Sequence, residues 1–159
     1  MLLLFTVGED RFGLDVRHVV EVIPHVNLKR LPKTPDYVAG LFNYRSVAVP
    51  VIDVSKMISG DMVRRHLSTR IIVVDYPYGG GGKHMLGLLA EHVTETAKFD
   101  RSAFISSGRG AQSAEFLGEL AIDEKGMVQC IRLDKLLPAD LRDTLFSPIE
   151  DEKIQAEAG

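Results

Sequence analysis

The chain has 159 residues, which is enough for one domain or two small ones. Hydrophobic residues make up 45% and support a folded core, the formal net charge is −3, and aromatic residues account for 7% with no tryptophan. A mildly acidic chain with few aromatic rings argues against a dedicated nucleic-acid binder, because such proteins present a basic patch or a platform for stacking bases.

The first residues and the single cysteine indicate a cytoplasmic protein. Residues 1–10 lack the basic segment that precedes the apolar core of a signal peptide, and no apolar stretch approaches the roughly 20 residues of a membrane span. Cys130 has no second cysteine with which to form a disulfide. Its apolar neighbours predict a buried, unreactive thiol.

Short apolar runs separated by turns predict β-hairpins along most of the chain. Residues 17–23 fit either a helical turn or a strand, and Pro24 limits any helix there. Pro50 places the strand 47–54 near an edge or a bulge of its sheet. The other predicted elements are a hairpin of 2–7 with 11–16, an extended connector at 31–35, hairpins of 70–75 with 85–89 and of 117–122 with 127–133, a helical segment at 134–146 interrupted by Pro138, and a polar, flexible tail at 147–159.

The two halves of the chain resemble each other. GLDVRHVVEVI at 13–23 aligns with GLLAEHVTETA at 87–97 without a gap, and 40–57 aligns with 118–136 with one insertion. A unit that occurs twice, with its strands in the same order, predicts two similar lobes side by side. Many short strands with turns between them favour small barrels. We therefore expect a single domain over 1–146 built from two interleaved lobes.

Signals for catalysis or metal binding are weak. Ser106-Ser107-Gly108-Arg109-Gly110 does not match the nucleophile motif G-x-S-x-G. The glycines at 79–82 precede Lys83, but neither Ser nor Thr follows and no helix pattern begins there, so a hairpin tip is favoured over a phosphate loop. No two of the five histidines have a recognised metal-ligand spacing. We predict no enzyme activity, no cofactor and no metal.

Two charged residues stand inside apolar segments. Glu21 lies in VVEVI at 19–23, and Arg45 lies between Tyr44 and the run that begins at Val47. Charged side chains are seldom buried unless they are paired. Either the two residues form a bidentate ion pair, or both point to water.

The motifs at 2–57 resemble the CheW-like domain family. LLFTVGEDRFGLDVRHVVEVI, followed by LKRLPKTPDYVAGLFNYRSVAVPVIDVSKMI, fits the family pattern closely, and the second half fits more loosely but in the same order, to about residue 138. The resemblance implies an all-β fold of two similar five-stranded SH3-like barrels around a shared hydrophobic core, with short helical turns and a C-terminal helix.

The resemblance also implies a non-catalytic adaptor. Such proteins couple the cytoplasmic tips of methyl-accepting chemoreceptors to the regulatory domain of a CheA-type histidine kinase, without nucleic acid or membrane insertion. The chain would then associate with membrane receptor arrays through its partners. By the family pattern, Glu21 and Arg45 occupy the acidic and basic motif positions, and Val16, Val19 and Val22 line the wall that receives the receptor hairpin.

The repeat extends this surface to the second lobe. Val16, Val19 and Val22 recur at every third position, and Ala90, Val93 and Thr96 are their equivalents. Two lobes that face each other would line one groove with both triplets, and an apolar groove suits a helical partner. The alternative is that the valines belong to the core.

Two departures from the family pattern affect the expected function. Ser46 replaces a glycine that supplies a positive φ at low cost in a turn, and 90–92 reads Ala-Glu-His where the family has V-D-x. Together with the glycine-rich tip, they suggest an alternative chemosensory pathway.

Two other functions compete with the adaptor role. One is a regulatory domain that docks onto a methyltransferase or a receiver domain, and the other is a small barrel that binds a ligand or an oligonucleotide.

Overall fold

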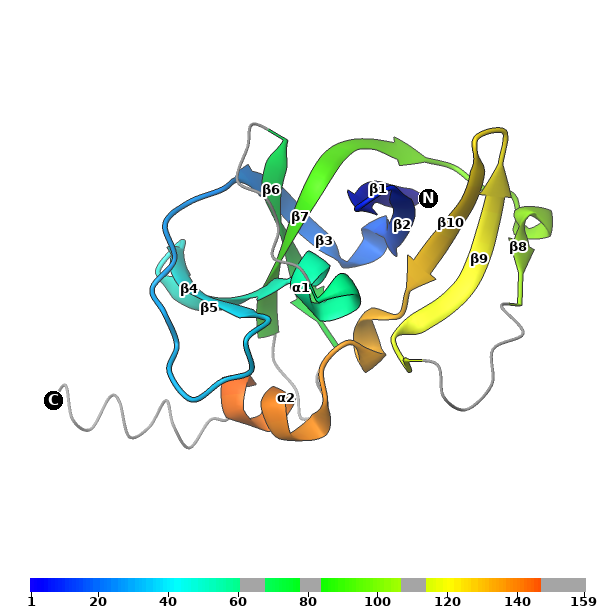
Figure 1. The fold of residues 1–159 in the computed structure, drawn as a ribbon. Coiled ribbons are helices and arrows are strands. Elements are labelled where there is room, and N and C mark those ends of the chain that lie inside the picture. Colours follow the sequence, from blue (N-terminus) through cyan, green and yellow to red (C-terminus); the bar gives the residue numbers. More distant parts are fainter. Residues whose placement is uncertain (61–67, 78–83, 107–113, 147–159) are drawn as a thin grey trace, which may run out of the picture.

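The computed structural model describes residues 1–60, 68–77, 84–106 and 114–146. Strands form two groups that are joined through one long strand, β7 (His84–Ala97), which arches from the left group to the right group in Figure 1. The glycine-rich hairpin tip, most of the serine-rich segment at 106–110 and the predicted tail at 147–159 lie outside the described residues.

Lobe one contains five strands in the order β3-β6-β7-β5-β4. Their bounds are β3 (Val19–Pro24), β4 (Val38–Tyr44), β5 (Val47–Asp53), β6 (Thr69–Tyr76) and the first part of β7. The strands enclose a small core that includes Phe42, Val49, Val51, Ile71 and Val73. This arrangement is the first of the two predicted barrels.

Lobe two uses the end of β7 and continues in the order β7-β1-β2-β10-β9-β8. The strands are β1 (Leu2–Val7), β2 (Asp10–Asp15), β8 (Phe104–Ile105), β9 (Leu117–Asp123) and β10 (Gly126–Ile131). Leu2, Leu4, Ala121 and Val128 form its core. The all-β fold with two barrel lobes is therefore as expected from the sequence.

The largest hydrophobic cluster lies between the lobes. Alternate residues of β6 and β1 serve different cores: Ile72 and Val74 enter the central cluster while Ile71 and Val73 face lobe one, and Leu3 is central while Leu2 and Leu4 face lobe two. A strand buried on both faces is apolar throughout. This explains the uninterrupted runs LLLF and IIVV in the sequence.

Each lobe contains one parallel strand contact at a glycine. Val51 of β5 pairs with Gly87 of β7, and Cys130 of β10 pairs with Gly13 of β2. A Cβ atom on Gly87 would lie 2.9 Å from Val51 Cγ2 and 3.0 Å from Ile71 Cγ2, and a Cβ on Gly13 would lie 3.0 Å from Val128 Cγ1. The equivalent glycines of the sequence repeat thus occupy equivalent, closely packed positions.

Residues 17–23, which fit either a helical turn or a strand, contribute to both. The 3-10 helix η1 (Val16–His18) is capped by Asp15, whose side chain accepts a hydrogen bond from Arg17 N at 3.0 Å. The β-branched residues that follow then form β3. A short cap thus turns the chain from lobe two into lobe one.

The helical turns and Pro50 refine the sequence-based expectations. Asp53 caps α1 (Val54–Ser59) by accepting from Lys56 N. Pro50 is buried on β5, which lies between β4 and β7 and so is not an edge strand. Pairing with β7 begins only at Val51, so the missing N–H of Pro50 precedes that ladder.

The predicted C-terminal helix is divided into η3 (Leu133–Lys135) and α2 (Ala139–Phe146), with Pro138 between them.

Replacing Gly87 with alanine should destabilise the protein. The added methyl group would collide with two branched side chains inside lobe one, and overpacking of this kind costs about 1–3 kcal/mol. Urea unfolding monitored by circular dichroism measures the loss. Gly118→Ala is the matched control, because its nearest neighbour is the flexible Arg132 stem at 3.1 Å. Equal losses for the two variants would contradict the close contact between β5 and β7.

Candidate partner-binding surface

Glu21 and Arg45 meet at the tip of lobe one. Arg45 Nη2 donates to Glu21 Oε1 at 3.0 Å, and Tyr44 Oη donates to the same oxygen at 2.5 Å. The Arg45 guanidinium also lies over the Tyr44 ring, 5.0 Å from its centroid. The hydrogen bond to the Glu21 carboxylate raises the pKa of Tyr44, with a further contribution from burial. The three side chains join β3 to the β4–β5 hairpin.

The geometry of this ion pair differs from the bidentate pair considered from the sequence. One guanidinium nitrogen makes the contact, and the side chains of Arg45 and Glu21 are 74% and 41% exposed. Exposed pairs contribute about 0–1 kcal/mol, because water and salt screen them. Arg45 is therefore held by Tyr44 and Glu21 while its charge remains accessible to a partner.

The hairpin tip adopts a backbone that disfavours its side chains. Arg45 has φ of 50° and Ser46 has φ of 69°, and two consecutive positive φ values characterise the tight type I′ hairpin turn. Asn43 Oδ1 accepts from Ser46 N at 2.8 Å and supports the turn from one side. The serine thus adopts the conformation for which the family pattern has glycine.

A β-bulge places the predicted valines on one face. Val19 stands opposite Val74 and Val22 stands opposite Ile72, while one extra residue of β3 is inserted between Val19 and Glu21. Directly opposed residues of antiparallel strands share a face, and Val74 and Ile72 both enter the central cluster. The three-residue spacing therefore fits a bulged strand as well as a helix.

The equivalent part of β7 is irregular in a similar way. Five residues from Glu91 to Glu95 stand against three residues of β1, from Leu4 to Thr6, and His92 within this bulge has φ of 52°. Beyond the bulge, Thr96 stands opposite Leu3 of the central cluster. Both triplets thus border the central cluster: the second lies on a bulged strand, and the first runs from η1 into one.

Burial divides the predicted surface. Val16, Val19 and Val93 are half-buried and pack against the central cluster, whereas Val22 is 37% exposed. Ala90 is buried and belongs to the core, so the second triplet cannot line a groove as a whole. Val20 is 47% exposed and was missed, because the sequence gives no sign of the bulge beside it.

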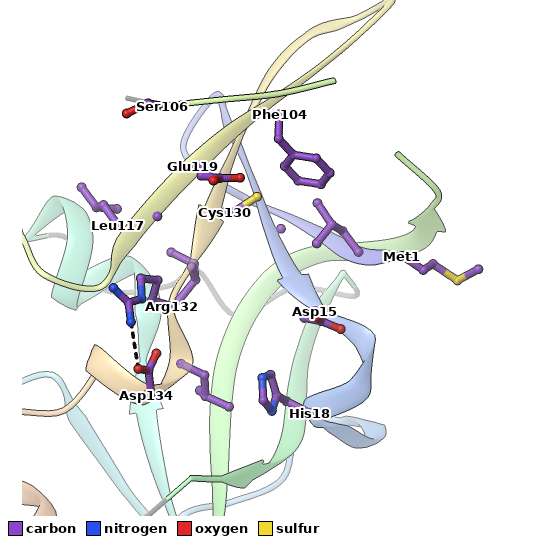
Figure 2. Close-up of a pocket in the computed structure, with 15 residues that line it drawn as sticks. Met1, Asp15, His18, Phe104, Ser106, Leu117, Glu119, Cys130, Arg132 and Asp134 are labelled. Carbon is purple, nitrogen blue, oxygen red and sulfur yellow. Dashed lines mark hydrogen bonds and ion pairs between the residues drawn. The ribbon is translucent and has the colours of Figure 1, made fainter. Parts of the chain in front are cut away.

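A separate pocket of about 620 Å³ lies in lobe two. Figure 2 shows Asp15 and His18 on one side of it, the ion-paired Arg132 and Asp134 on another, and the Cys130 sulfur between Glu119 and Phe104. Cys130 is half-buried, not fully buried as predicted, and this burial raises the pKa of its thiol to about 11, which disfavours the reactive thiolate. None of the six predicted binding residues lines this pocket.

A bidentate ion pair that the sequence did not reveal fastens the tip of lobe two. Arg11 on β2 donates to both carboxylate oxygens of Asp123 at 2.8 and 2.6 Å, although the two residues are 112 positions apart. Asp123 also accepts from Lys125 N in the β9–β10 turn. Hydrogen bonds from Arg11 lower the pKa of Asp123 to about 2, and those from Arg17 lower the pKa of Asp15 to about 2.

Within the described part of the chain, no three His, Cys, Asp or Glu side chains cluster as metal ligands would. The same residues contain no helix that is long and apolar enough to cross a membrane. What the geometry offers is an exposed apolar strip on β3 beside an accessible arginine, on a rigid scaffold of two barrels. Such a surface suits binding to another protein.

Comparison with known proteins places this scaffold in a class. The family model described as CheW-like domain matches residues 1–140. The chain is 25% identical to chemotaxis protein CheW of Klebsiella aerogenes over 140 residues, which cover 87% of this chain and 81% of that protein. It is 27% identical to a probable chemotaxis protein CheW of Rhizobium etli over 143 residues, with 85% of each chain covered.

A solved structure has the same fold. The scaffolding protein TtCheW from Thermoanaerobacter tengcongensis superposes with a TM-score of 0.76 at 26% identity, over 87% of this chain and 88% of that one. The fold and surface thus define a two-barrel scaffold protein of the chemotaxis type. The chain belongs to the CheW-like domain family, whose members are non-catalytic adaptors in chemosensory arrays.

The Ser46→Gly variant should be more stable than the natural chain. A left-handed backbone costs a non-glycine residue about 1–2 kcal/mol, and glycine removes this cost while keeping the amide that donates to Asn43. Thermal unfolding measures the gain. In the Ser46→Ala control the strain remains, so no gain is expected. A destabilised glycine variant would contradict the positive φ at this turn.

Stability should fall in acid partly through Asp123. Its pKa is lower in the folded chain than in the unfolded chain, so its contribution is complete above about pH 4 and is lost as the pH falls toward about 2. Asp123→Asn should reduce stability at neutral pH and flatten its dependence on pH in that window. Urea midpoints across the range test this. Glu124→Gln on the same turn is the control, and an unchanged slope in Asp123→Asn would contradict the role of the pair.

Proposed function

We propose that this chain is a non-catalytic adaptor that couples chemoreceptors to a CheA-type histidine kinase. The match of residues 1–140 to the CheW-like domain carries the proposal. The two-barrel fold supports it, since the described chain is built as a rigid scaffold with an exposed apolar strip. The partners on this proposal are the regulatory domain of the kinase and the cytoplasmic tip of a methyl-accepting receptor.

The receptor-binding surface is placed on β3 and its surroundings. Val22 and Val20 supply exposed apolar area, while Val16, Val19 and Val93 form a half-buried base that joins them to the central cluster. Helical partners bury apolar anchors in such surfaces. Glu21 and Arg45 lie at the neighbouring hairpin tip, where the accessible guanidinium can donate to a carboxylate of a partner.

The cellular setting follows from these partners. A chain that binds the cytoplasmic end of a receptor works in the cytoplasm and reaches the membrane array through its partners. An alternative chemosensory pathway, suggested by Ser46 and the 90–92 sequence, stays a prediction. Activation of a cognate kinase in a reconstituted receptor array tests the adaptor role. A chain that binds neither kinase nor receptor would contradict it.

The Val22→Asp variant should lose receptor binding while the fold survives. The side chain is partly exposed, so a carboxylate there remains hydrated in the free protein and becomes unfavourable once a helix covers it. Receptor co-sedimentation and thermal unfolding on the same variant separate the two effects. Val19→Asp should lose stability as well, because Val19 packs on the central cluster.

The matched control is Ile122→Asp. Ile122 is 45% exposed, lies on a strand of lobe two, and is remote in sequence from the proposed receptor surface. It should leave receptor co-sedimentation unchanged. If Val22→Asp is folded and still binds the receptor normally, Val22 is not part of the interface.

A further inference from the structure

A cleft near the C-terminal helix lies apart from the receptor surface proposed above. It has a volume of about 460 Å³ and is lined by residues of four segments: Tyr37, Met57, 114–116, and 134–139 with Arg142. In Figure 1, α2 lies below α1, which contributes Met57. The volume falls within the range of small-molecule sites.

The cleft contains a cation whose donor is not satisfied. Arg142 Nε is buried, and none of the described residues accepts a hydrogen bond from it. The ion pairs formed within the described chain involve other cations, namely Arg11, Arg17, Arg45, Lys56 and Arg132. A buried donor without an acceptor costs free energy, and more so when the group is charged. Arg142 lines the cleft, so an anion bound there would lie beside its guanidinium and would recover this cost once the covered Nε turns toward the opening.

The groups that surround Arg142 in the described part of the chain do not neutralise its positive charge. The buried Tyr76 hydroxyl beside it accepts from Leu137 N at 3.3 Å and is a neutral partner. Asp134 lines the cleft but is paired with Arg132 at 3.1 Å. Lys135 and Glu115 also line the cleft, and both are exposed. Their charges are opposite and cancel. The cleft therefore carries the uncompensated positive charge of Arg142.

The remaining walls are apolar. Phe116, Met57 and the ring of Tyr37 are half-buried, and Leu136 is buried behind them. Apolar walls with one oriented cation select a ligand that has an apolar body and one negative group. A carboxylate matches the guanidinium best, because it accepts two parallel hydrogen bonds from Nε and one Nη.

We propose that this cleft binds a carboxylate attached to a small apolar group, with Arg142 as its anchor. Two sources present this chemistry: a free organic acid, or an acidic side chain next to an apolar residue in a peptide. The proposal is independent of the adaptor function. It predicts a second site on the scaffold, lined by none of the residues proposed for the receptor surface.

The test uses the full chain and a pair of probes that differ in charge alone. 3-Phenylpropionate should bind saturably, whereas 3-phenylpropanol should bind at least about tenfold more weakly, since it lacks the charge-assisted hydrogen bonds. In NMR spectra, the Nε–Hε signal of Arg142 should shift as the acid binds. An acidic peptide with Ile next to Glu is the second arm, and its affinity relative to the free acid identifies the source.

Variants of the anchor complete the test. Arg142→Gln should weaken binding of the acid by about tenfold or more, and Arg142→Lys should weaken it less, because charge remains without the paired donors. Arg30→Gln, at an exposed site outside the cleft, should bind as the natural chain does. If Arg142→Gln fails to fold, the Nε–Hε signal and the lysine variant decide. Equal binding of acid and alcohol, an unmoved Arg142 signal at saturation, or no saturable binding would overturn the proposal.

Discussion

Strand β7 has to serve two barrels at once, and the rest of the structure depends on it. Its first part pairs with β6 and β5 in lobe one, and its end pairs with β1 in lobe two. A strand that crosses from one closed sheet to another must change direction. The bulge at 91–95 provides this change, and it turns the alternating strand pattern into the three-residue spacing of Ala90, Val93 and Thr96.

The shared core follows from this constraint. Because the lobes are continuous through β7 and through the η1 turn, their outer faces meet and bury the largest hydrophobic cluster between them. The cores of the individual lobes are smaller. Stability therefore rests on contact between lobes as much as on closure of either barrel. The proposed receptor surface borders this cluster, and a surface that is already ordered before binding holds its binding groups at low entropic cost.

Charge is used differently at three places in the protein. At the tip of lobe two, Arg11 and Asp123 form two short hydrogen bonds and neutralise each other. At the tip of lobe one, Arg45 makes one contact to Glu21 and stays exposed. In the cleft beside α2, a buried nitrogen of Arg142 has no acceptor among the described residues. The same side-chain type thus fastens one hairpin, leaves its charge exposed at another, and has a buried nitrogen without an acceptor among the described residues beside α2.

The sequence by itself determined the fold class, the hairpins and the family, because these depend on local patterns: two-faced apolar runs, turn residues and a motif over 2–57. It also brought Glu21 and Arg45 to attention as charges in apolar runs. Only the tertiary structure decided that this pair is exposed, that Ala90 is core, that Val20 is accessible, and that Arg142 Nε has no acceptor among the described residues. The physical reason is that burial and pairing depend on residues distant in sequence, as the 112 positions between Arg11 and Asp123 illustrate.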